Sequence, residues 1–214
     1  YSLLQVMSRF GLSLGFGDKT VKEVCEMNNV DCQTFLVVVN FMAEGFSRMD
    51  GSDDDISIPA MDDYLRQANI YFLDYCLPAI RRKLIEAIDC SQDDVSFLIL
   101  KFFDGYMREV RKHMEYEEKT VFKYVDTLIH GNAPKNYQIS TFSKHHDQVG
   151  ERLTELKNII IKYCPAKANT NVLNAALFDI YACEEGLESH CKVEDYLFVP
   201  AILKLERRMR ENEK

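Results

Sequence analysis

Two histidine–glutamate pairs, each with a spacing of four residues, are the side chains of this sequence best suited to chemistry. His113 is followed by Glu117, and His190 is followed by Glu194. Residues four apart lie on one face of an α-helix, so each pair would present an imidazole and a carboxylate to the same point. His146 lies in a third segment with helical apolar spacing. Three imidazoles and two carboxylates would therefore meet in an apolar interior.

Such a meeting of polar groups predicts a metal site. Burying two carboxylates costs several kcal/mol each unless a cation compensates their charge. Ligands of mixed imidazole and carboxylate type suit iron or manganese, and zinc is a further option. The alternative is that each pair forms a hydrogen bond within its own helix, on a solvated face and without a metal.

Four long helices are predicted to position these side chains. Apolar residues recur every three to four positions over about residues 59–88, 92–128, 140–163 and 170–205. We expect Pro78 to bend the first helix near Asp74, and Ser91 with Asp94 to form a capping box at the start of the second. Because such stripes are buried best against one another, the sequence predicts an all-α fold, a four-helix bundle with up-down-up-down connections.

The predicted bundle is preceded by a smaller part of the chain. Residues 1–48 read as a small N-terminal helical domain, 49–58 as an acidic linker, and 59–214 as the bundle. The linker contains three consecutive aspartates, which would repel one another in a packed element.

Two short helices are expected within this N-terminal domain. Asp18 would cap a helix from Lys19 to about Met27, and Asp31 would cap a second one through Phe41. Two helices joined by a tight turn could form a DNA-binding helix-turn-helix. The scarcity of basic residues favours a small helical docking module instead.

Composition sets limits on the partners and the cellular environment. The 214 residues carry a formal net charge of -8, which disfavours nucleic acid as a partner. Seven cysteines without a CxxC pair indicate reduced thiols, and a cytoplasmic location is expected. No apolar run reaches the length of a membrane span, so no membrane association is expected.

Three sequence segments resemble hemerythrin-like di-iron proteins. His113–Phe122 is similar to the "HMxxEE" helix of that family, His146–Glu151 to its "EHDxxGE" helix, and His190–Pro200 to its "HxxxExxxLFP" helix. Within the superfamily the sequence most resembles the repair-of-iron-centres group, which also carries a small N-terminal helical domain, here similar over Phe10–Phe41.

This resemblance implies a non-haem di-iron centre inside the bundle. Glu117 and Glu194 would bridge the irons, while His113, His146 and His190 would be terminal ligands. It further implies protection or repair of iron–sulfur clusters under nitrosative or oxidative stress, with iron–sulfur proteins as clients and O2 or NO as small ligands. Whether the protein is an enzyme and whether it is a homodimer stay open. The alternative is a degenerate sensory or protein-interaction module with one weak metal site or none.

Three positions differ from the pattern of the family. The loop after the first bundle helix lacks the family's additional histidine and has Cys90 and Ser91 in that region. The first bundle helix has Asn69 at its inward position instead of a histidine, and Asn69 is either a core amide or a substitute ligand. Where the family has paired cysteines, the chain has Cys32, with Cys25 across the turn. Of the other singled-out residues, His130 is expected to cap a helix end and Cys183 to fill the core.

Overall fold

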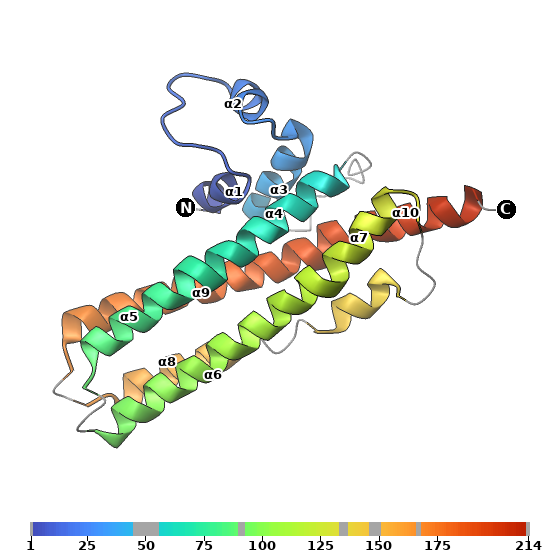
Figure 1. Cartoon of the computed structure of the whole chain (residues 1–214). Helices are drawn as coiled ribbons and strands as arrows, with labels where there is room; N and C mark the ends of the chain where they lie inside the picture. Colours follow the sequence, from blue (N-terminus) through green and yellow to red (C-terminus); the bar gives the residue numbers. More distant parts are fainter. Residues whose placement is uncertain are drawn as a thin grey trace. The chain divides into compact units, whose positions relative to one another are not determined.

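The described part of the chain is helical and has no strand. The computed structural model describes residues 2–44, 56–89, 93–132, 137–145, 151–165 and 168–212. Its helices run in the order shown in Figure 1. The prediction of an all-α fold, a helical bundle preceded by an N-terminal helical part, is confirmed.

The N-terminal part contains three helices, α1 (Ser2–Arg9), α2 (Val21–Met27) and α3 (Cys32–Glu44). Helix α1 was not predicted. The expected cap at Asp18 is wrong, because Thr20 caps α2 and forms a capping box with Glu23. The expected cap at Asp31 is confirmed: its Oδ1 accepts the Thr34 N–H at 2.7 Å.

The later helices are longer and three of them contain a π-helical turn. The first comprises α4 (Ile58–Ile70), a π turn (Tyr71–Cys76) and α5 (Leu77–Ala87). The second comprises α6 (Asp94–Tyr116), a π turn (Glu117–Val121) and α7 (Phe122–Ile129). Helix α8 (Glu151–Tyr163) follows, and then α9 (Thr170–Val193), a third π turn (Glu194–Phe198) and α10 (Val199–Asn212).

Three predicted helix boundaries are wrong. Helix α6 starts at Asp94 because Asp93 caps it, with its Oδ2 accepting the Ser96 N–H at 2.6 Å. Residues Ile139–His145 form a 3-10 helix rather than the start of an α-helix. The last helix continues to Asn212 instead of ending at 205. Ser91 and most of the predicted linker lie outside the described residues, so the predicted domain boundaries stay a prediction.

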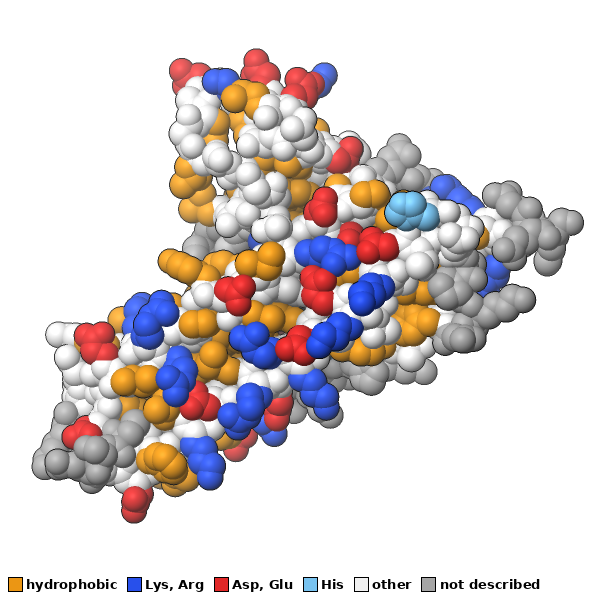
Figure 2. All heavy atoms as spheres, in the orientation of Figure 1, with side chains coloured by type: hydrophobic (Ala, Val, Ile, Leu, Met, Phe, Trp, Pro, Cys, Tyr) orange, Lys and Arg blue, Asp and Glu red, His pale blue; other side chains and the backbone are white. Residues whose placement is uncertain are grey.

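One of the two compact units of the chain contains Ile70–Lys119 and Lys144–Glu188. Its helices α5, α6, α8 and α9 alternate in direction (Figure 1). Ion pairs connect each helix to the next: Arg81–Asp104, Glu109–Arg152, Lys157–Glu184 and Asp179–Lys83. Basic and acidic side chains are accordingly interspersed on the surface in Figure 2. Because the side chains of each ion pair are partly exposed, the pairs contribute little to the free energy of unfolding. Their main effect is to favour this arrangement of neighbouring helices.

The other compact unit contains Tyr1–Asn69, Thr120–Ser143 and Ser189–Lys214. In it the N-terminal helices pack on α4 through Phe10, whose ring lies 4.8 Å from that of Tyr64 between centroids. Glu206 of α10 is buried and accepts the Tyr124 hydroxyl at 2.5 Å and the Ile139 N–H at 3.1 Å. These bonds connect α7 and the 3-10 helix to α10.

Asp62 on α4 should make the stability of the protein depend on pH. Burial raises the pKa of this carboxyl from 3.8 to about 6, although Arg66 opposes the rise with an ion pair at 2.7 Å. The native state therefore binds more protons than the unfolded state between these values. The free energy of unfolding should fall by roughly 2–3 kcal/mol as pH rises from 4 to 7.

In an Asp62→Asn variant the free energy of unfolding should not show this fall between pH 4 and 7. Chemical denaturation between pH 4 and 7 should show the variant gaining stability relative to the wild type as pH rises. Asp94→Asn, which changes an exposed carboxylate, is the matched control. Parallel stability curves for wild type and Asp62→Asn would contradict the assignment.

None of the described helices combines the length and the apolar character that crossing a bilayer requires.

Candidate metal centre

The two predicted histidine–glutamate pairs occupy equivalent positions in two helices. His113 lies near the end of α6, and Glu117 is the first residue of the π turn that follows. His190 lies near the end of α9, and Glu194 is likewise the first residue of a π turn. A π turn widens a helix locally and is frequent at functional sites. A π turn begins at each of the two glutamates, which supports a functional role for both positions.

Prolines explain two of the three π turns. Pro78 is the second residue of α5 and Pro200 the second of α10, and each follows a π turn directly. A proline has no N–H to donate to the carbonyl four residues earlier. Those carbonyls belong to Asp74 and Tyr196, which lie inside the π turns. The sequence prediction of a bend near Asp74 therefore found the first of these π turns, and Pro200 carried the same signal for the other.

In each pair the histidine contacts the glutamate of the same helix, and both glutamates are buried. The Nε2 of His113 lies 2.8 Å from Oε1 of Glu117, and the Nε2 of His190 lies 3.4 Å from Oε1 of Glu194. Both glutamate side chains are 0% exposed, His190 is 1% exposed and His113 13%. The alternative of intrahelical pairs is thus correct about the contacts, but wrong about a solvated face.

Three of the predicted ligands come together. One ligand atom each from His113, Glu117 and Glu194 lies within 4.8 Å of the other two. His190 adjoins this group through its contact with Glu194. His146 lies outside the described residues. The role of all five as metal ligands stays a prediction, and the geometry brings three of them to a common point.

The chemistry of this donor set fits a cation. Two carboxylates without solvent exposure repel each other in a medium of low dielectric constant, and this arrangement is costly unless positive charge lies beside them. A divalent metal supplies that charge directly. Imidazole and carboxylate ligands together are suited to iron, manganese and zinc.

Asn69 is buried on α4, with 3% of its surface exposed. It is the second-last residue of that helix, two residues before the π turn that begins at Tyr71. Its carbonyl oxygen is a weaker ligand than an imidazole. The structure confirms that the position faces the interior, and both interpretations of Asn69, core amide or substitute ligand, remain compatible with its burial.

Other singled-out residues lie as expected. His130 caps the end of α7, with its Nδ1 2.7 Å from the Asp126 carbonyl oxygen. Cys183 is buried in α9. The contact between Cys25 and Cys32 described below was not predicted.

The described residues form a helical bundle with a buried cluster of histidine and glutamate, an arrangement typical of metal-binding helical bundles. The family model of the hemerythrin HHE cation-binding domain matches residues 60–202, which is more than half of the chain. The chain therefore belongs to the hemerythrin HHE family. No curated protein matches the sequence.

Proposed function

We propose that this protein binds non-haem iron, two ions when the site is complete, and takes part in iron–sulfur cluster repair under nitrosative or oxidative stress. The observation that carries the proposal is the buried group of His113, Glu117 and Glu194, whose ligand atoms lie within 4.8 Å of one another. Membership of a cation-binding family supports the metal. The resemblance to the repair-of-iron-centres group supports the process, and a cytoplasmic location accords with it.

Five side chains of this protein would act as metal ligands. Glu117 and Glu194 would bridge, and His113, His146 and His190 would each supply one nitrogen. Bound iron supplies exchange of electrons and open positions for small ligands such as O2 or NO. Met114, Val121 and Leu197 are buried on the same helices as Glu117 and Glu194, so apolar side chains accompany the two buried carboxylates.

Protons must leave when a metal enters. The Nε2 of His113 and Oε1 of Glu117 lie 2.8 Å apart, so both atoms could serve one metal. Imidazole and carboxylate groups bind a metal only in their unprotonated forms, so protons compete with the metal for these atoms. Metal uptake should therefore weaken as pH falls.

Repair is tested with a client whose iron–sulfur cluster has been damaged by nitric oxide. The iron-loaded protein should restore the cluster, as followed by the client's activity and absorption. Glu117→Gln should lose this ability, and Glu118→Gln, a neighbour in the same π turn, should keep it. Iron binding without restoration would reject the repair function while leaving the metal site intact.

Asn69 favours a second candidate, the degenerate sensory or protein-interaction module. With a weaker ligand on the first helix, such a module would hold one metal weakly or none. It predicts a melting temperature that does not respond to a chelator.

A further inference from the structure

The turn between α2 and α3 brings two cysteines together. After Cys25 the chain reverses: the carbonyl oxygen of Cys25 accepts the N–H groups of Asn28 at 3.1 Å and Val30 at 2.9 Å. Asn29 takes a left-handed conformation with φ 55°, which asparagine tolerates better than most residues. Cys32 is the first residue of α3, and its side chain lies near enough to the Cys25 thiol to raise the pKa of that thiol.

The two thiols differ in their access to solvent. Cys25 is 0% exposed, whereas Cys32 is half-buried, and both are free cysteines. Burial raises the pKa of Cys25 to about 11, and the neighbouring Cys32 adds to the rise. A reagent in solution therefore reaches Cys32 first, while Cys25 lies behind it and within reach of its sulfur.

We propose that Cys25 and Cys32 form a reversible disulfide site whose oxidant is a small-molecule disulfide of the glutathione type. The Cys32 thiolate attacks one sulfur of the oxidant, which forms a mixed disulfide and releases one small thiol. The Cys25 thiolate then attacks the Cys32 sulfur, which forms the Cys25–Cys32 bond and releases the second small thiol. Two protein thiols are oxidised, one disulfide is reduced, and the two protons pass to the released thiolates.

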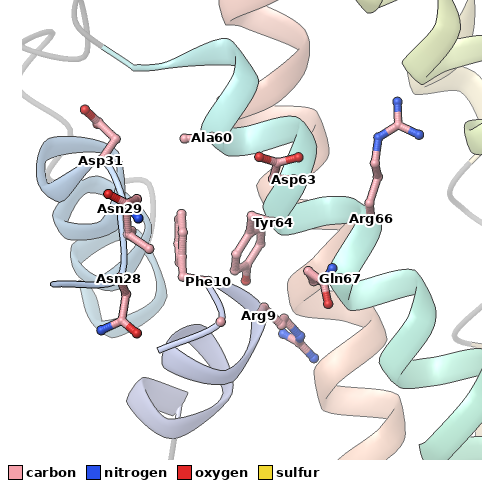
Figure 3. A pocket seen from close by; sticks show the side chains of 12 residues that line it. Arg9, Phe10, Asn28, Asn29, Asp31, Ala60, Asp63, Tyr64, Arg66 and Gln67 are labelled. Atoms are coloured by element: carbon pink, nitrogen blue, oxygen red, sulfur yellow. The ribbon is translucent and has the colours of Figure 1, made fainter. Parts of the chain in front are cut away.

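The disulfide would cross-link the two ends of a segment that lines a cleft. The cleft has a volume of about 510 Å³ and lies between this turn and α4 (Figure 3). Asn28, Asn29, Val30 and Asp31 line it on the turn side, and all four lie between the two cysteines in the sequence. Oxidation would therefore fix both ends of this segment and slow amide hydrogen exchange of these residues.

The test uses the full chain, first reduced and then equilibrated with oxidised and reduced glutathione at a series of ratios. Free thiols are alkylated and the peptides are identified by mass spectrometry. The wild type should give a linked Cys25–Cys32 peptide that dithiothreitol removes. Cys25→Ser should instead accumulate glutathione on Cys32, because the resolving thiol is missing. Cys32→Ser should leave Cys25 unmodified.

Cys164→Ser is the matched control, since Cys164 is also half-buried but belongs to the other compact unit. It should form the Cys25–Cys32 link as the wild type does. Glutathione that remains on Cys32 of the wild type, or a link from Cys25 to a different cysteine, would overturn the proposal. So would an absence of any change at Cys25 and Cys32 at every ratio. The readout does not depend on bound metal.

Discussion

A Glu194→Gln variant is expected to lose tight metal binding and to be more stable than the wild type when both are metal-free. Glu194 is 0% exposed and contributes an atom to the group that contains Glu117 and His113. Glutamine keeps the shape but removes one of two buried like charges. The metal-free variant should gain about 1–3 kcal/mol in free energy of unfolding.

Denaturant titration of chelator-treated proteins measures this gain, and metal analysis measures the loss of binding. Glu185→Gln, an exposed change on the same helix, is the matched control and should alter neither quantity. A metal-free Glu194→Gln protein that unfolds more easily than the metal-free wild type would show that the carboxylate stabilises the fold without a cation.

Removal of the metal is expected to lower the melting temperature of the wild type by about 10 °C. A metal that binds only the native state at a thousand times its dissociation constant adds about 4 kcal/mol of stability. In a domain of this size each kcal/mol shifts the melting temperature by roughly 2–4 °C. Differential scanning calorimetry before and after chelation gives the shift directly.

The double variant Glu117→Gln with Glu194→Gln controls for effects of the chelator on the protein itself. Its melting temperature should be the same with and without chelator. An unchanged melting temperature in the metal-loaded wild type would instead favour the degenerate module that Asn69 suggests.

The spacing of residues predicted the two histidine–glutamate contacts better than it predicted the ends of the helices that carry them. The i,i+4 pairs placed His113 with Glu117 and His190 with Glu194 correctly, because a helix fixes which residues share a face. The same periodicity placed Asn69 inside. These inferences depend only on local geometry, which a sequence carries directly.

Helix ends and π turns were harder to predict because they depend on single competing side chains. Asp93 and Thr20 cap their helices where Ser91 and Asp18 were expected, and all four are chemically capable of capping. The π turn at Glu117 has no following proline to signal it, unlike the turn that precedes Pro78. Such choices are decided by packing between helices, which periodicity alone does not encode.

The cysteines show a similar limit. Cys25 and Cys32 are seven residues apart, and only the tight turn between them, with its hydrogen bonds to the Cys25 carbonyl, brings the thiols together. Composition indicated reduced thiols, and the sequence placed Cys25 across a turn from Cys32 without predicting that the two thiols interact.

The most direct test is the number of iron equivalents bound per chain after anaerobic loading, for the wild type and for His113→Ala. If His113, Glu117 and Glu194 hold a metal, the wild type retains at least one equivalent through gel filtration, and the variant loses it. Fewer than one equivalent in the wild type, with no further loss in His113→Ala, would contradict the account.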